Sequence, residues 1–204
     1  HEPFDVPEEY LKLVGDDYDG PLYMWPEYKT LEDGHINAEE LCHIRKRYMA
    51  LLYMTDDYLG RIFDVMDRYS MWQDTMLIYT TDHGYMLGEH EYLAKNYMPA
   101  YNEVFNIPLI IHFPGNEYAG KRVKSLTQNI DVMPTLMEFH GIPQNGNLRN
   151  PIHGKSLIPM VSGAVDKVRE YAIYGYFGKQ MNITDGRYTY FRSPNELNRP
   201  LYLY

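Results

Sequence analysis

Apolar side chains recur every three or four positions between residues 38 and 69, and this period predicts a long amphipathic α-helix. Asn37 directly precedes the periodic segment, and Glu40 follows Asn37 by three positions. This spacing is typical of a capping box, in which each side chain accepts a hydrogen bond from the other residue's backbone N–H. We therefore expect a helix that begins after Asn37 and ends near residue 69.

Two short apolar segments follow this helix and predict strands over 75–81 and 107–113. The second ends at Pro114-Gly115, and its nearly continuous apolar run is typical of a strand covered on both faces of a parallel sheet. The segment 84–106 between them shows no clear period. A helix followed by two such strands favours an α/β layer with a mostly parallel sheet.

The last third of the chain changes from helix to strand patterns. Asp131 is expected to cap a helix that runs to Phe139, because Gly141 suits the end of a helix. Asp185-Gly186 predicts a two-residue hairpin turn. The strands expected around it are 171–177, 181–184 and 187–191.

These patterns predict the fold class α/β. Residues 1–36 are rich in Pro, Gly, Asp and Tyr and are expected to be extended or irregular. The helix and the parallel strands fall in 1–165, and a small antiparallel β section begins at 166 and runs to 204.

The composition narrows the classes of partner. The chain has 204 residues and a net charge of −9, which argues against nucleic-acid binding because that function needs a basic surface. No run of about 18 apolar residues is present, so we expect no transmembrane segment. The chain begins with His1 rather than Met, which favours a piece of a longer polypeptide and leaves its localisation unknown.

The segment 80–84, Thr-Thr-Asp-His-Gly, spans the end of the first predicted strand and the loop that follows it. Ligands of open α/β sheets bind just beyond the carboxyl ends of strands. There Asp82 and His83 can both face one divalent cation, and Lys95, thirteen residues after Asp82, can bind an anion held by that cation. This combination indicates hydrolysis of a sulfate or phosphate ester. Two ligands are too few for a catalytic metal site, so the others must come from elsewhere.

Two further histidines are candidates for substrate contacts. His1 lies in a constrained His-Glu-Pro segment and could donate a proton or a hydrogen bond to a substrate oxygen. His90 is close in sequence to the proposed site and could line it. Each feature alone also has a structural explanation: Asp82 could cap a turn, a lone loop lysine is usually solvated, and His1 could have no role.

No residue of the chain stands out as a nucleophile. Cys42 lies within the predicted helix, where its apolar neighbours favour a small core residue, and His43 is expected at the surface or at an interface. The sequence has no Gly-x-Ser-x-Gly motif and no phosphate-binding glycine loop. Because ester hydrolysis of this kind needs a nucleophile, we interpret the chain as part of an enzyme.

Several motifs in chain order resemble the sulfatase family, within the alkaline-phosphatase-like superfamily, and they cover most of the chain. They are His1-Glu2-Pro3, Asp56-Asp57-Tyr58-Leu59-Gly60-Arg61-Ile62, Asp74-Thr75, Thr81-Asp82-His83-Gly84, Leu87-Gly88-Glu89-His90, Lys95, Tyr101-Asn102-Glu103, Ile107-Pro108-Leu109-Ile110-Ile111, Pro114-Gly115, Asp131-Val132-Met133-Pro134-Thr135-Leu136, Gly154-Lys155-Ser156-Leu157 and Asp185-Gly186-Arg187-Tyr188. The resemblance implies a partial α/β/α sandwich. Residues 1–165 would form the C-terminal part of the catalytic domain, and 166–204 would begin a small antiparallel subdomain.

The resemblance also implies roles for single residues. Asp82 matches a carboxylate ligand of the catalytic cation, and His83 matches the next metal position, which is Asn in many sulfatases. A His at that position is similar to phosphonate monoester hydrolases. Lys95 and His1 match residues that contact the anionic group of the substrate. The family implies Ca²⁺ as the metal, with Mn²⁺ or Zn²⁺ as alternatives because of the imidazole of His83.

The family nucleophile is a formylglycine made from a Cys/Ser-x-Pro-x-Arg motif, and that motif is absent from this chain. We therefore expect the chain to be inactive alone. Three hypotheses stay open: a sulfatase acting on small-molecule or carbohydrate sulfate esters, a phosphonate monoester or phosphodiester hydrolase, and a non-catalytic structural or binding module. A homo-oligomer also stays open.

Overall fold

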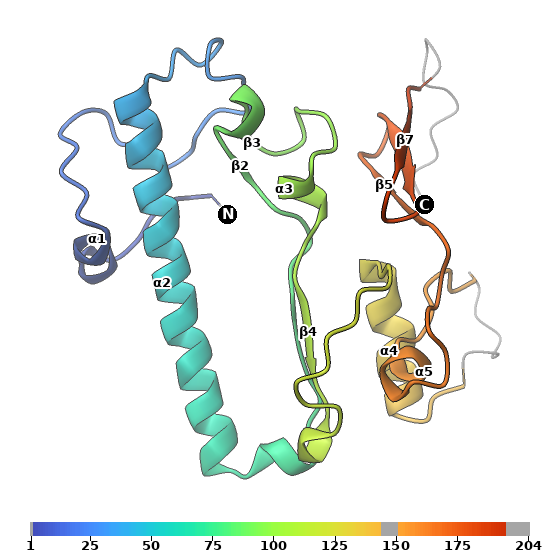
Figure 1. Ribbon diagram of the computed structural model, residues 1–204. Helices are drawn as coiled ribbons and strands as arrows, with labels where there is room; N and C mark the ends of the chain where they lie inside the picture. Colours follow the sequence, from blue (N-terminus) through green and yellow to red (C-terminus); the bar gives the residue numbers. More distant parts are fainter. Residues whose placement is uncertain (1, 144–150, 195–204) are drawn as a thin grey trace. The chain divides into compact units, whose positions relative to one another are not determined.

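The computed structural model describes residues 2–143 and 151–194, and it divides into two compact units, His1–Asn116 and Glu117–Tyr204 (Figure 1). The helices of the first unit are α1 (Glu8–Val14), α2 (Ala38–Arg68), α3 (Asn102–Phe105) and the short turns η1 (Met71–Gln73), η2 (Glu89–Glu91) and η3 (Pro114–Asn116). Its strands are β1 (Leu77–Thr80), β2 (Met86–Leu87), β3 (Leu93–Ala94) and β4 (Leu109–His112).

Helix α2 begins where the capping pattern predicts. Asn37 Oδ1 accepts hydrogen bonds from the backbone N–H groups of Glu39 and Glu40, and Glu40 Oε2 accepts from the N–H of Asn37. The predicted helix over 38–69 is confirmed. Cys42 is exposed, so our expectation of a core residue was wrong. His43 is buried, which excludes the surface position that was one of our two alternatives for it. The buried face of α2 follows His43 and Arg47, and Cys42 lies one position out of that phase.

The core of the first unit joins segments that lie far apart in the sequence. Phe4, Ile44, Tyr85, Leu93 and Ala94 are buried against one another. They connect the N-terminal segment to α2 and to the β2–β3 pair. This packing brings the first residues of the chain close to the loop that follows β1, where the candidate chemistry lies.

Strands β1 and β4 pair antiparallel, with Leu77 opposite His112 and Thr80 opposite Leu109. We expected both strands in a mostly parallel sheet, and this pairing corrects that expectation. A parallel pair needs a crossover connection that returns the chain to the starting edge. The segment between these strands instead turns back at the edge where β1 ends, and its helix α3 has only four residues.

The helices of the second unit are η4 (Asn129–Asp131), α4 (Val132–Phe139) and α5 (Ile158–Ser162), and its strands are β5 (Ala172–Gly175), β6 (Met181–Thr184) and β7 (Thr189–Arg192). The three strands form one antiparallel sheet, so the predicted antiparallel section is confirmed. The turn between β6 and β7 contains Asp185 and Gly186, but it spans four residues rather than two. The carboxylate of Asp185 accepts hydrogen bonds from the N–H groups of Arg187 and Tyr188, which closes the longer turn.

Asp131 does not cap α4 through its side chain, contrary to our expectation. Its carboxylate is fully buried and accepts hydrogen bonds from the backbone N–H groups of Gln128 and Lys155, and from the guanidinium of Arg169. The carboxylate therefore ties three segments of the second unit together.

Two other sequence predictions have different outcomes. Helix α1 lies within 1–36, which we expected to be irregular, and it is only seven residues long. The predicted domain division between 165 and 166 concerns a longer protein, and it stays a prediction. Within the described residues, no helix is long and apolar enough to span a membrane.

Asn37→Ala removes the side-chain acceptor that serves two N–H groups at the start of α2. We expect the free energy of unfolding to fall by about 1 kcal/mol in urea titrations. Asn37→Ser is the matched control, because its hydroxyl retains the acceptor, and it should lose much less. Equal losses of stability in both variants would contradict a stabilising role for the side-chain acceptor at position 37.

Candidate active site

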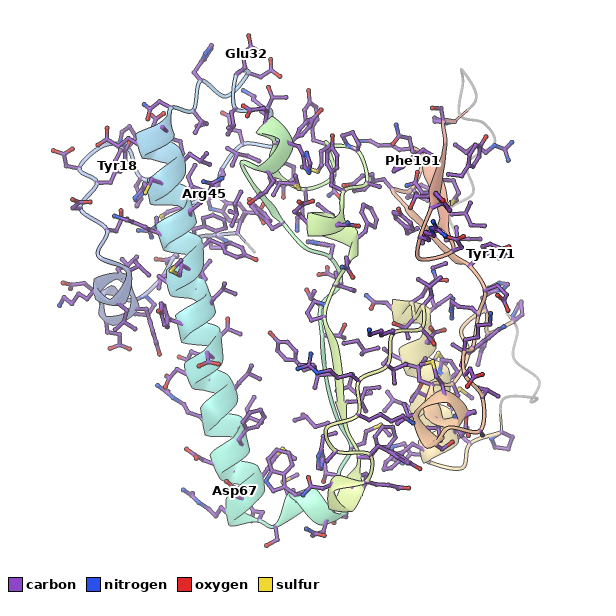
Figure 2. All side chains as sticks on the ribbon, viewed as in Figure 1. Tyr18, Glu32, Arg45, Asp67, Tyr171 and Phe191 are labelled. Atoms are coloured by element: carbon purple, nitrogen blue, oxygen red, sulfur yellow. The ribbon has the colours of Figure 1, made fainter. Side chains whose placement is uncertain are left out.

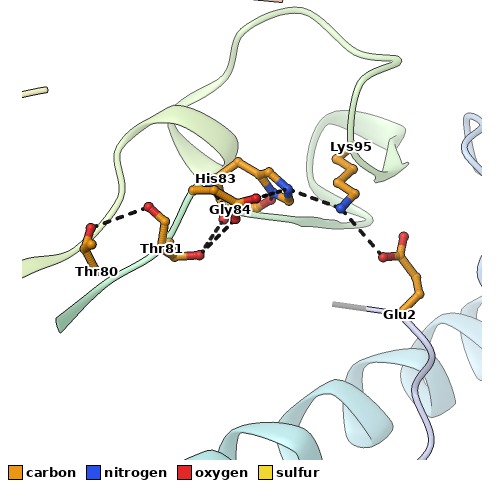
Figure 3. Close-up of polar contacts among 7 residues, drawn as sticks. Glu2, Thr80, Thr81, His83, Gly84 and Lys95 are labelled. Atoms are coloured by element: carbon orange, nitrogen blue, oxygen red, sulfur yellow. Dashed lines mark hydrogen bonds and ion pairs between the residues drawn. The ribbon is translucent and has the colours of Figure 1, made fainter. Parts of the chain in front are cut away.

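The loop after β1 is held to the start of β4 and folded on itself. Thr80 Oγ1 donates to the carbonyl oxygen of Pro108 at 2.9 Å. Thr81 Oγ1 donates to the carbonyl oxygen of His83 at 3.2 Å, and the N–H of His83 donates to Asp82 Oδ1 at 3.0 Å (Figure 3). These bonds fix Asp82 and His83 side by side at the end of the strand.

Gly84 allows α3 to pack directly on this loop. Its N–H donates to the carbonyl oxygen of Val104 at 2.7 Å. A Cβ atom at Gly84 would lie 1.8 Å from the carbonyl oxygen of Glu103, a distance that backbone atoms cannot accommodate. A side chain at this position would therefore displace either α3 or the His83 loop.

The two ring nitrogens of His83 have different partners. Nδ1 lies 2.8 Å from the carbonyl oxygen of Gly84. Since a carbonyl oxygen only accepts, this contact places a proton on Nδ1 and leaves the lone pair of the neutral ring on Nε2. Nε2 lies 3.2 Å from Asp82 Oδ2 and 3.2 Å from Lys95 Nζ. Nε2 thus lies beside both the carboxylate and the ammonium group, and its lone pair accepts from Lys95.

Lys95 follows β3 and is buried, with a side chain that is only 9% exposed. Its Nζ lies 3.9 Å from Oε2 of Glu2, whose side chain is fully buried. Glu2 Oε1 accepts a hydrogen bond from the hydroxyl of Tyr85 at 3.0 Å. The close-up in Figure 3 shows Lys95 between His83 and Glu2.

Burial tends to raise the pKa of Glu2, because a carboxylate is poorly solvated in the core. Hydrogen bonds from its own backbone and from Tyr28 and Tyr85, together with the charge of Lys95, outweigh burial and lower the pKa below 4.5. Burial also raises the pKa of Tyr85, and its hydroxyl therefore stays a donor. Glu2 is thus an ionised partner for Lys95.

Sequence reasoning did not identify Glu2, although a signal was present. Glu2, Phe4 and Val6 are buried, whereas Pro3 and Asp5 are exposed. This alternation of two is that of an extended segment with one buried face. A carboxylate in the buried phase of such a segment needs a partner of opposite charge.

The other candidate residues lie apart from this set. His90 stacks on Tyr101, with ring centroids 4.0 Å apart, and its Nε2 lies 3.6 Å from Glu103 Oε1. The structure gives His90 no polar contact with Asp82, His83 or Lys95 in the described part of the chain. Our prediction for His1 lies outside the described residues. The roles of all these residues stay predictions.

Comparison with known proteins decides the family. The family model described as Sulfatase matches residues 1–142, which is more than half of the chain. The chain belongs to the sulfatase family. The resemblance of its motifs to this family, and to the alkaline-phosphatase-like superfamily, is confirmed.

Individual relatives give the extent of the likeness. The multifunctional alkaline phosphatase superfamily protein PehA of Trinickia caryophylli is 38% identical over 135 residues, which are 65% of this chain and 24% of the relative. The N-acetylglucosamine-6-O-sulfatase of Bacteroides thetaiotaomicron is 32% identical over 114 residues, 56% of this chain and 19% of the relative. The chain thus spans about a quarter or less of the length of these curated relatives.

A solved structure supports the fold assignment. The phosphonate monoester hydrolase of Agrobacterium radiobacter superposes with a TM-score of 0.75 at 24% identity, covering 95% of this chain and 46% of that chain. At this identity the likeness establishes a shared fold. The chain therefore shares the mixed α and β fold of that hydrolase. The sheets formed by the described residues are small and antiparallel, so the mostly parallel sheet that we predicted is not confirmed.

The chemistry of Asp82 and His83 fits two ligands of a divalent-cation site. Asp82 Oδ2 and His83 Nε2 lie 3.2 Å apart, a separation that suits two ligands of one cation. A metal-ligating histidine typically donates its other ring N–H to a carbonyl or carboxylate, as His83 Nδ1 does to Gly84. Among the described residues, no group of three or more His, Cys, Asp or Glu side chains is arranged to hold a metal ion. Further ligands are therefore needed.

Glu2→Gln removes the charge that faces Lys95 and retains a side chain of similar shape. We expect the free energy of unfolding at pH 7 to fall by about 2 kcal/mol in urea titrations. Because the folded-state pKa of Glu2 is lowered, its contribution is complete above pH 4.5 and is lost as the pH falls through the folded-state value. The curves of the wild type and the variant should therefore converge below pH 4.5.

The matched control is Glu8→Gln, which changes an exposed glutamate that pairs with Lys12 on the surface of α1. Its stability should equal that of the wild type within error at each pH. A stability difference for Glu2→Gln that stays constant from pH 7 to pH 3 would contradict the ionised Glu2–Lys95 pair.

Proposed function

We propose that the protein containing this chain hydrolyses sulfate esters, with carbohydrate sulfates as the preferred class of substrate. The observation that carries the proposal is the arrangement of Asp82, His83 and Lys95 around a single point at the end of β1. A carboxylate oxygen, a nitrogen lone pair and a buried ammonium group together suit an anion bound to a cation. Membership of the sulfatase family supports this interpretation.

In this proposal Asp82 and His83 hold a divalent cation, either Ca²⁺, as in the family, or Mn²⁺ or Zn²⁺. When bound, the cation would act as a Lewis acid that neutralises charge on the transferred group and activates the nucleophile. The remaining ligands and a formylglycine nucleophile would come from residues outside this chain, and the chain alone would be inactive. His83 is oriented for its role by the bond from Nδ1 to Gly84.

Lys95 would bind a non-bridging oxygen of the sulfate group and stabilise the negative charge that grows there in the transition state. Glu2 would be a positioning residue, because it holds the ammonium group without touching the substrate. His1 would contact the same anionic group or protonate the leaving oxygen. His90, stacked on Tyr101, would contact the substrate beyond the reacting group.

The nature of the substrate follows from the relatives only as a proposal. The printed name of one relative is N-acetylglucosamine-6-O-sulfatase, and this favours a sulfated sugar. A second candidate is a phosphonate monoester or phosphodiester hydrolase. It is favoured by His83, which stands where many sulfatases have Asn, and by the fold shared with a phosphonate monoester hydrolase. Both reactions use the same tetrahedral anion geometry.

The proposal is tested by the turnover of an aryl sulfate and an aryl phosphodiester, with and without added divalent metal, in the protein containing this chain. Preference for the sulfate would support a sulfatase, and preference for the phosphodiester would support the second candidate. Turnover of neither aryl substrate, in folded protein with an intact nucleophile motif and added metal, would favour a narrow natural substrate, and the test is then repeated with N-acetylglucosamine 6-sulfate. No turnover of any of the three would contradict both candidates.

Asp82→Ala should abolish metal-dependent turnover, since it removes a proposed ligand.

Lys95→Ala should lower kcat/KM by about 100-fold, because one preorganised charge contact to the transition state is lost. Lys29→Ala is the matched control: Lys29 pairs with Glu27 on the surface, and its loss should leave kcat/KM unchanged. Wild-type kinetics in Lys95→Ala would remove this lysine from the site.

A further inference from the structure

The second unit contains a pocket that is lined by its own residues alone. Three segments line it: 124–126, 167–171 and the β6–β7 turn at 185–187. Its volume is about 480 Å³. Four cationic side chains line it, Lys124, Lys167, Arg169 and Arg187, against two carboxylates, Glu170 and Asp185. A pocket with excess positive charge is a local exception in a chain with a net charge of −9.

The two carboxylates are already engaged. Glu170 Oε2 lies 2.6 Å from Lys167 Nζ. Asp185 Oδ1 accepts hydrogen bonds from the N–H groups of Arg187 and Tyr188, at 2.8 and 2.7 Å. The bonds from Tyr188 and Arg187 lower the pKa of Asp185. Both acids are thus occupied by partners close in sequence, and neither pairs with the cations Lys124 and Arg187.

Arg169 lines the pocket but is already paired with other residues of the second unit. Its side chain is 9% exposed, and its guanidinium group pairs with the buried carboxylate of Asp131 and with Gln128. Its buried Nε has no hydrogen-bond partner in the part of the chain that the structure describes. The buried ion pair with Asp131 therefore holds the side chain of Arg169 at the edge of the pocket.

Lys124 and Arg187 are the cations that remain available. Both are exposed, and neither forms an ion pair with a carboxylate within residues 2–143 and 151–194. The guanidinium group of Arg187 lies over the ring of Tyr188, 5.1 Å from its centroid. Tyr171, labelled in Figure 2, also lines the pocket and is 59% exposed.

We propose that this pocket binds a sulfate or carboxylate group of an anionic saccharide. Lys124 and Arg187 would contact the anion, because a guanidinium group and an ammonium group are the usual donors to such oxygens. Tyr171 would pack against the sugar ring, since an exposed tyrosine presents both an apolar face and a polar end. Only the choice of a saccharide rests on the proposed function, and binding is measured here without turnover.

The test is isothermal titration of the protein with a trisulfated heparin disaccharide at low salt. Lys124→Ala and Arg187→Ala should each weaken binding about tenfold, since each removes one charge-assisted contact. Both side chains are exposed, and Arg187→Ala retains the backbone N–H that closes the turn, so folding should be preserved. Lys12→Ala, which removes an exposed cation of α1 in the other unit, should bind like the wild type.

Further probes distinguish the possible sources of binding. The unsulfated disaccharide should bind at least tenfold more weakly, and Arg187→Lys should recover part of the loss of Arg187→Ala. If inorganic sulfate binds as tightly as the disaccharide, the pocket is a site for small anions, and the proposal that it binds a saccharide is contradicted. Wild-type affinity in a variant that carries both Lys124→Ala and Arg187→Ala would contradict the proposal that this pocket binds the disaccharide. Loss of binding in Lys95→Ala alone would also contradict it, because the disaccharide would then bind at the candidate active site.

Discussion

A buried lysine is costly unless an ionised partner lies beside it, and the first unit is organised around this constraint. The partner of Lys95 is Glu2, which is 93 positions away in the sequence. The pairing requires the N-terminal segment to pack into the core with α2 and the β2–β3 pair. Phe4 of that segment packs against Ile44 and Tyr85. The candidate active site therefore depends on the hydrophobic core, because packing of the N-terminal segment in the core places the carboxylate of Glu2 beside the ammonium group of Lys95.

The same ammonium group links Glu2 to the loop after β1. Lys95 Nζ lies 3.2 Å from His83 Nε2, and that nitrogen also faces Asp82. The orientation of the ring depends on its bond to the carbonyl of Gly84, and Gly84 in turn provides the space for α3. The site is thus positioned by backbone contacts and by one buried charge pair.

Local signals in the sequence were sufficient for the parts of the fold that depend on neighbouring residues. The Asn37–Glu40 capping box, the limits of α2 and the hairpin at Asp185 were predicted because their hydrogen bonds join residues a few positions apart. The order Asp82, His83, Lys95 indicated the chemistry that we propose, and the roles of these residues stay predictions. The antiparallel pairing of β1 and β4, the buried His43 and the role of Glu2 were not predicted, because each depends on contacts between segments that no local period encodes.

Long-range ¹H–¹⁵N NMR spectra of the ring of His83 test most directly whether the site is arranged as the geometry indicates. They report which nitrogen carries the proton, and the signal is assigned by its loss in His83→Asn. In the neutral ring, a proton on Nδ1 and a lone pair on Nε2 are expected, since the carbonyl of Gly84 only accepts. A neutral ring with its proton on Nε2 would contradict this arrangement, because that N–H could neither accept a hydrogen bond from Lys95 nor bind a cation beside Asp82.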